Sequence, residues 1–272
     1  MKFIPRLSLG CWKPARNTEI DFFYRLIDTG FSTLDLGEGY QFFGKNHHRL
    51  NFHRLYINRD KIRIVYKIGA KQTLSGNCLF EENEWDSNIQ TFIRVTNADY
   101  IDCLMLWSIP EFAQLRLVCR WIIKKIINGE IKSFGMSNVS LLQVEIMCEI
   151  FQEETSSSLS EIPSIIQLRC TPLIPESLNA LSLYKKMNLE IQAYGIFHSG
   201  LLFQNRSETH SRYKQEFEMI SISDNYHHDK NGYNELLRKT IKEVISAGAT
   251  TLVLSPRDDN QLSELRGILC EL

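Results

Sequence analysis

The chain has little net charge, no closely paired cysteines and no long hydrophobic run. Its formal net charge is -1 at pH 7 over 272 residues, which gives no electrostatic reason to bind nucleic acid or an acidic membrane surface. No stretch approaches the roughly 20 apolar residues that a membrane-spanning helix needs. The first residues lack the long apolar core of a signal peptide. We therefore expect neither a nucleic-acid partner nor a membrane partner.

The seven cysteines contain no C-x-x-C pair, and most of them lie in apolar surroundings. This distribution is typical of buried free thiols in a reducing compartment, so we expect a cytoplasmic protein. His227 and His228 lack the Cys or carboxylate spacing of a metal site. We expect solvated surface there, and no metal.

Eight short apolar runs alternate with amphipathic segments along almost the whole chain. The predicted strands are Leu7–Leu9, Phe31–Leu34, Ile62–Tyr66, Tyr100–Leu106, Ile131–Met136, Ser164–Leu168, Leu189–Ala193 and Thr250–Leu254. The predicted helices are Thr18–Thr29, Asn88–Thr96, Phe112–Asn128, Leu141–Phe151, Glu176–Lys186 and Tyr233–Ala247. Strands separated by helices form a parallel sheet, and eight of them favour closure. We expect an α/β protein in which residues 1–272 form one (β/α)8 TIM barrel domain.

Polar residues follow two of these strands. Asp35 and Tyr40 come after the second strand, and Lys67 closes the third. Taken singly, each has a more common structural explanation: a capping Asp, a half-buried Tyr and a solvated Lys. Together they suit proton donation, because Lys67 beside Tyr40 would lower the pKa of the phenol and Asp35 would hold the lysine. A barrel places its active site at these strand ends.

The same segments resemble the aldo-keto reductases. Asp35 to Tyr40 and Lys67-Ile68-Gly69 match the family's Asp-Thr-Ala-x-x-Tyr and Lys-x-Gly motifs, and Gly129 to Asn138 closely follows Gly-Lys-Ile-Arg-x-x-Gly-Val-Ser-Asn. Leu9-Gly10-Cys11-Trp12 is similar to the opening strand, with Cys11 where threonine is usual. The resemblance implies a barrel of the aldo-keto reductase type. It also implies an NAD(P)H-dependent oxidoreductase, with NADPH or NADH as cofactor and a small carbonyl or related unsaturated compound as substrate.

The resemblance also implies roles for single residues. Tyr40 is the expected acid, with Lys67 and Asp35 tuning it. Ser137, Asn138 and Gln167 match the positions that bind the nicotinamide carboxamide, and they supply the donor and acceptor groups that an amide needs.

Further cofactor positions follow along the chain. Tyr194 matches the tyrosine on which the nicotinamide ring stacks, and Gly200 and Leu202 match a Gly-x-Leu beside the pyrophosphate. The segment from Ser255 to Gln261 resembles the family's last cofactor-binding segment. Arg257 in it would pair with the 2'-phosphate of NADPH, or is a surface arginine opposite Asp258 or Asp259.

The chain departs from the family at the fourth catalytic position, where a histidine is usual. Counting from Asp102 puts Trp107 there, whereas counting back from Pro110 puts Ser108 there. An indole donates one hydrogen bond but carries no proton through a reaction, and its bulk reduces the space for a substrate. We expect Trp107 to shape the pocket. Where the family usually has an asparagine that contacts the adenine, this chain has Leu265. These departures favour an alternative: a non-redox lyase or isomerase, or a ligand-binding protein, on the same barrel.

Overall fold

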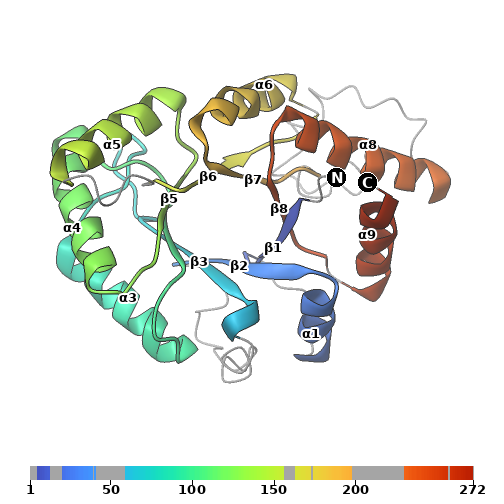
Figure 1. Cartoon of the computed structure of the whole chain (residues 1–272), viewed down its shortest axis with the longest axis horizontal. Coiled ribbons are helices and arrows are strands. Elements are labelled where there is room, and N and C mark those ends of the chain that lie inside the picture. Colours follow the sequence, from blue (N-terminus) through green and yellow to red (C-terminus); the bar gives the residue numbers. More distant parts are fainter. Residues whose placement is uncertain are drawn as a thin grey trace.

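Eight parallel strands form a closed barrel in which each strand is hydrogen-bonded to the next and β8 pairs with β1 (Figure 1). The computed structural model describes residues 5–12, 20–38, 40, 59–155, 163–172, 174–197, 230–256 and 258–271, with backbone alone for 20–23 and 230–233. The strands are β1 Arg6–Gly10, β2 Phe31–Gly37, β3 Arg63–Ile68, β4 Cys103–Leu106, β5 Phe134–Ser137, β6 Ile165–Arg169, β7 Glu190–Tyr194 and β8 Thr251–Leu254. The predicted (β/α)8 barrel is confirmed.

Helices surround the barrel on its outer side (Figure 1). They are α1 Ile20–Asp28, α3 Glu82–Thr96, α4 Leu115–Ile127, α5 Leu141–Glu154, α6 Pro175–Tyr184, α8 Lys230–Ala247 and α9 Asp259–Glu271. All six predicted helices are present with shifted ends. The sequence prediction did not include α9.

Helix α3 shows why these segments become helices. Trp85, Ile89, Phe92 and Thr96 are buried and recur every three or four residues, so they form one face against the barrel. The predicted start at Asn88 was too late, because Trp85 belongs to the same face. Asn97 ends the helix in the left-handed conformation (φ 50°), which asparagine tolerates.

The fourth and fifth strands begin later than predicted. Ile101 and Ile131 pair in one isolated parallel bridge, and continuous pairing of β4 with β5 starts only at Leu104 and Phe134. Each apolar run therefore begins before its strand does, because these residues are buried before the continuous hydrogen bonding between the strands starts.

The interior of the barrel is divided by polarity. Val65, Cys103, Met105 and Ile165 form a small apolar cluster. Buried polar side chains make up another part of the interior: Ser8, Thr33, Asp35, Lys67, Ser137, Gln167, Gln192 and Thr251. A buried polar group without a hydrogen bond is unfavourable, and most of these side chains belong to one connected network, whereas the buried Ser8 Oγ has no hydrogen-bond partner among the described residues.

Glu190 is one end of that network, at the start of β7. Its carboxylate accepts hydrogen bonds from Arg63 Nη1 at 2.5 Å, Gln192 Nε2 at 2.8 Å and Thr251 Oγ1 at 3.0 Å, and it pairs with Arg6 at 3.1 Å. Burial raises the pKa of Glu190, but the Arg63 guanidinium and the hydrogen bonds outweigh burial and hold that pKa below its usual range. Glu190 therefore joins β1, β3, β7 and β8.

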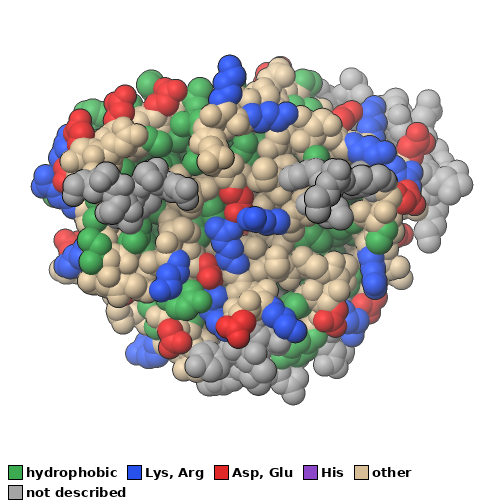
Figure 2. Space-filling model, in the orientation of Figure 1, with side chains coloured by type: hydrophobic (Ala, Val, Ile, Leu, Met, Phe, Trp, Pro, Cys, Tyr) green, Lys and Arg blue, Asp and Glu red, His purple; other side chains and the backbone are tan. Residues whose placement is uncertain are grey.

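On the face of the molecule shown in Figure 2, acidic and basic side chains are interspersed, and neither kind of charge predominates. Among the described residues, no helix combines the length and the hydropathy needed to cross a membrane.

Replacing Glu190 by Gln removes the charge that Arg63 and Arg6 share. We expect the free energy of unfolding at pH 7 to fall by about 2–3 kcal/mol, since breaking a largely buried pair leaves a cation uncompensated. The folded pKa of Glu190 lies below the unfolded value of about 4.3, so its stabilisation is complete above that pH and is lost as the pH falls through the folded pKa. Urea unfolding at neutral and acid pH measures both effects.

Glu149→Gln, at an exposed position of α5, is the matched control and should change stability little. An equal loss for Glu190→Gln at neutral and strongly acid pH would contradict the role given to the Glu190 charge.

Candidate active site

Lys67 and Asp35 form a buried ion pair at the C-terminal ends of β3 and β2. Lys67 Nζ lies 2.8 Å from Asp35 Oδ1 and 2.7 Å from Oδ2. The lysine and aspartate side chains are 6% and 5% exposed. The register of β2 with β3 pairs Gly37 with Lys67 and Asp35 with Val65, so neighbouring strands bring the two charges together. The pairing expected from the sequence is confirmed.

Gln167 joins this ion pair from β6, on another part of the barrel wall. Its Oε1 accepts a hydrogen bond from Lys67 Nζ at 2.9 Å, and its Nε2 donates to Asp35 Oδ1 at 3.0 Å and to Gln192 Oε1 at 3.0 Å. Gln167 is 1% exposed. Because Gln192 in turn donates to Glu190, one chain of hydrogen bonds runs from Lys67 through the interior to Glu190.

Tyr40 is buried beside the ion pair, but its acidity differs from the prediction. Lys67 Nζ lies 5.3 Å from the centre of the Tyr40 ring. Burial raises the pKa of the phenol, and the Asp35 carboxylate raises it further. The prediction that Lys67 lowers this pKa is wrong for the structure as it stands. Among the described residues, the Lys67 ammonium donates to Asp35 and Gln167 and not to the Tyr40 hydroxyl.

The Tyr40 and Trp107 rings lie beside the ion pair, and Trp12 packs against both rings. Tyr40 meets Trp12 at 5.0 Å between ring centres and Trp107 at 5.5 Å, both edge to face, and Trp12 meets Trp107 at 5.7 Å. Such edge-to-face pairs are favourable for aromatic quadrupoles. We call this set of Trp12, Tyr40 and Trp107 the aromatic cluster.

The structure decides between the two alignments of the missing histidine. Lys67 Nζ lies 5.8 Å from the Trp107 ring, so the indole faces the ion pair. The Ser108 hydroxyl instead accepts a hydrogen bond from Gln72 on the exposed side. Of the two candidates, Trp107 is therefore the one that lies beside the ion pair.

Gly37 makes the close packing of the cluster possible. A Cβ atom at Gly37 would lie 3.0 Å from Tyr40 Cε1, 3.2 Å from Trp107 Cζ3 and 3.3 Å from Lys67 Cβ. Each distance is shorter than an ordinary van der Waals contact. The absence of a side chain at Gly37 thus leaves room for both rings.

A group of amide and hydroxyl side chains adjoins the ion pair at the ends of β5, β6 and β7. Ser137 Oγ lies 3.4 Å from Gln167 Oε1. Asn138 adopts the left-handed conformation (φ 57°), donates to the Trp107 carbonyl at 3.2 Å and accepts from the Tyr194 hydroxyl at 2.7 Å. The structure therefore brings together Ser137, Asn138, Gln167 and Tyr194, which are four of the predicted cofactor positions.

The remaining predicted positions lie apart or outside the described residues. Ser255 Oγ donates to the Gly10 carbonyl at 2.6 Å, and the backbone N–H of Gln261 donates to Asp258 Oδ1 at 2.9 Å at the start of α9. Asp259 forms an ion pair with Arg25 at 2.8 Å. Two carboxylates therefore stand at this helix start, where a phosphate was expected. Gly200, Leu202 and Arg257, with His227 and His228, lie outside the described residues.

Sequence reasoning missed the part that Gln192, Trp12 and Gly37 play. Gln192 had a signal: Glu190, Gln192 and Tyr194 alternate with apolar residues in β7, which places all three on one face of the strand. Trp12 follows β1 directly, as polar and aromatic site residues follow the other strands. Gly37 had the weaker signal of a glycine within the Asp35–Tyr40 motif.

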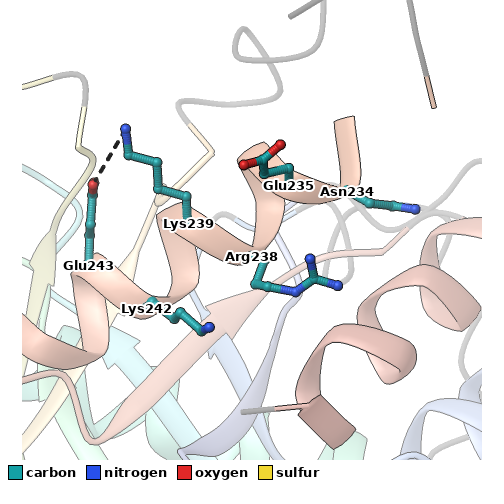
Figure 3. A pocket seen from close by; sticks show the side chains of 6 residues that line it. All are labelled: Asn234, Glu235, Arg238, Lys239, Lys242 and Glu243. Carbon is teal, nitrogen blue, oxygen red and sulfur yellow. Dashed lines mark ion pairs between the residues drawn. The ribbon is translucent and has the colours of Figure 1, made fainter. Parts of the chain in front are cut away.

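A cavity of about 630 Å³ lies elsewhere, along α8 (Figure 3). Its described lining consists of Asn234, Glu235, Arg238, Lys239, Lys242 and Glu243, all from this outer helix. It contains none of the residues grouped around Lys67. Because its charges are of both signs and lie along one helix, it offers no comparable set of converging groups.

The model of the Aldo/keto reductase family matches residues 6–255. The chain belongs to this family. The matched range includes the ion pair, the aromatic cluster and the amide group described above. No curated protein sequence matches the chain.

Solved structures of aldo-keto reductases share the fold at low sequence identity. An enzyme from Klebsiella pneumoniae in complex with NADPH is 16% identical, with a TM-score of 0.66 over 98% of this chain and 86% of that one. AKR11C1 from Bacillus halodurans, in its holo form, is 15% identical with a TM-score of 0.69 over 98% and 87%. The glycerol dehydrogenase AKR11B4 from Gluconobacter oxydans is 18% identical with a TM-score of 0.67 over 97% and 86%.

Gly37→Ala should destabilise the protein by about 1 kcal/mol, because the new methyl group crowds Tyr40 and Trp107. Gly267→Ala, in α9 with open space around the new atom, is the matched control and should stabilise by about 0.5–1 kcal/mol. Chemical denaturation of both variants measures whether the free energy of unfolding falls for Gly37→Ala and rises for Gly267→Ala.

A double mutant tests which ring is crowded. If Trp107 is the obstacle, Gly37→Ala should cost less in a Trp107→Ala background than in the native protein. Strict additivity of the two changes would show that Gly37 does not make room for Trp107.

Proposed function

We propose that the protein is an NAD(P)H-dependent reductase of a small carbonyl or related unsaturated compound. The observation that carries the proposal is the contact between two sets of groups. The buried Lys67–Asp35 pair beside Tyr40 meets the amide group of Ser137, Asn138 and Gln167 through the hydrogen bond from Lys67 to Gln167. Machinery for proton donation thus adjoins groups that suit a nicotinamide. The NADPH and holo complexes among the structural relatives support this reading.

The residues present fit the nicotinamide part of the cofactor. Its carboxamide needs an acceptor for its N–H groups and a donor for its oxygen, which Gln167 Oε1 and the Ser137 hydroxyl or Asn138 amide provide. Tyr194, fixed by its hydrogen bond to Asn138, supplies an aromatic ring next to them. When bound, the cofactor supplies a hydride.

The protein's own contribution is proton donation and exclusion of water. Tyr40 is the proton donor to the carbonyl oxygen. The Lys67 ammonium compensates the negative charge that the Tyr40 phenol acquires when it gives up its proton. Asp35 holds the ammonium in place. The aromatic cluster keeps water from the ion pair, which strengthens these electrostatic effects.

Trp107 restricts the substrate. Its ring fills space next to Tyr40, so a bulky substituent on the carbonyl carbon would meet the indole. The indole N–H offers one hydrogen bond to a substrate oxygen but no exchangeable charge. A small, flat carbonyl compound fits these limits.

The second candidate is a non-redox lyase or isomerase, or a ligand-binding protein, on the same barrel. One observation favours it: Asp258 and Asp259 stand where a cofactor phosphate was expected, and a helix start with two carboxylates repels an anion. Because Arg25 neutralises Asp259, the repulsion is reduced, and we place the reductase first.

Cofactor binding separates the two candidates. Titration with NADPH and with NADH should change the intrinsic fluorescence, since Trp12 and Trp107 adjoin the site. Tyr40→Phe should bind either cofactor with nearly unchanged affinity while its turnover of aldehydes falls by about two to four decades. Absence of binding for both cofactors would lead us to abandon the reductase.

Trp107→His tests the substitution that distinguishes this chain. The change removes bulk and adds an imidazole that can hydrogen-bond a carbonyl oxygen, so we expect it to raise the reduction of simple aldehydes. Rates over a panel of aldehydes of increasing size measure this. Trp107→Phe, which keeps a ring without the imidazole, is the control. A loss of activity in Trp107→His without any new aldehyde reduction would instead show a pocket built for a different substrate.

A further inference from the structure

The Lys67 ammonium has no free donor in this structure. A lysine ammonium carries three N–H groups. Two of them meet Asp35 Oδ1 and Oδ2 at 2.8 and 2.7 Å, and the third meets Gln167 Oε1 at 2.9 Å. Tyr40 is the neighbour that the proposed reaction requires, and its hydroxyl receives none of the three. The ammonium must release one acceptor before it can donate to the phenol.

Gln167 is the acceptor that can be released. The Asp35 contact joins two opposite charges, whereas the Gln167 contact joins a charge to a neutral amide. The Gln167 amide is oriented by Asp35 and Gln192, which both accept from Nε2. Its Oε1 therefore faces Lys67 and Ser137, on the side where the amide group adjoins the ion pair.

We propose that Gln167 is a positioning residue that couples cofactor binding to Tyr40. In the free protein, the third N–H of Lys67 donates a hydrogen bond to Gln167 Oε1. When a nicotinamide carboxamide donates its N–H group to this oxygen, the Gln167 contact with Lys67 weakens and the ammonium turns to the Tyr40 hydroxyl. The acid is thus prepared only after the cofactor is present. This inference rests on the proposed function for its trigger, but not for the contact in the free protein.

The groups that face Tyr40 agree with this sequence of events. Burial and the Asp35 carboxylate disfavour a phenolate at Tyr40, and Cys11 and Tyr194 do so when they are ionised. Among the described residues, Lys67 is the cation that lies against the Tyr40 ring, at 5.3 Å from the ring centre. A hydrogen bond from Lys67 would therefore be the main influence that lowers the pKa of Tyr40.

The test measures the ionisation of Tyr40 directly. Protein labelled with ¹³C at the tyrosine ζ position gives one resonance per tyrosine, and Tyr40→Phe identifies the resonance of Tyr40. In the free native protein we expect Tyr40 to stay protonated throughout the alkaline range in which the fold persists. In free Gln167→Met, the titration midpoint should fall into this range, because the third N–H then meets the phenol. Saturating NADPH should lower it similarly in the native protein.

Three further variants make the outcome decisive. Gln167→Glu restores an acceptor for Lys67 and should keep Tyr40 protonated. Gln192→Met removes one of the two acceptors that orient Gln167 and leaves the contacts of Gln167 with Asp35 and Lys67 in place, so it should lower the midpoint of Tyr40 less than Gln167→Met does. If Gln167→Met does not fold, Gln167→Asn withdraws the oxygen by one methylene and serves in its place.

The outcomes separate this inference from the proposed function. If Tyr40 titrates in free Gln167→Met, or in Gln167→Asn used in its place, as it does in the native protein, the coupling is overturned, whatever NADPH does. If NADPH binds, as followed by fluorescence, and leaves native Tyr40 unchanged, the coupling is also wrong. If NADPH does not bind, the reductase fails, and the comparison in the free protein still decides whether Gln167 restrains Lys67.

Discussion

The buried ion pair of Asp35 and Lys67 is the interaction on which the interior of this barrel depends. Transferring each charge from water into the interior costs several kcal/mol, and the mutual attraction offsets this only where further hydrogen bonds complete both partners. Gln167 completes both, because its oxygen meets Lys67 and its nitrogen meets Asp35. The remaining Gln167 N–H requires Gln192, and Gln192 requires Glu190. One ion pair at the C-terminal ends of β2 and β3 thus accounts for the chain of hydrogen bonds that runs through the interior to Glu190.

The aromatic cluster sets how the ion pair can be used. Trp107 packs edge to face against Tyr40, and its indole lies 5.8 Å from Lys67 Nζ. Gly37 provides the space that these two rings occupy. Under the proposed function, this apolar bulk beside the ion pair strengthens electrostatic effects on a carbonyl oxygen and restricts the size of the substrate.

The alternation of apolar runs with helical patterns was sufficient to predict the barrel, since eight such runs have few other arrangements. It was also sufficient to place Asp35 and Lys67 side by side, because they end neighbouring strands. It did not reveal the bond between Lys67 and Gln167, which lie 100 residues apart on strands that are not neighbours and meet only across the closed interior. The acidity of Tyr40 was predicted with the wrong sign, because the sequence does not show how deeply the phenol is buried or where the ammonium points.

A crystal structure of the protein with NADPH tests the account most directly. We predict the nicotinamide carboxamide against Ser137, Asn138 and Gln167, with the Lys67 Nζ to Gln167 Oε1 distance lengthened beyond a hydrogen bond and Lys67 Nζ within hydrogen-bonding distance of the Tyr40 hydroxyl. A cofactor bound away from these side chains would contradict the account. So would a complex in which the nicotinamide lies beside Tyr40 and Lys67 still donates to Gln167.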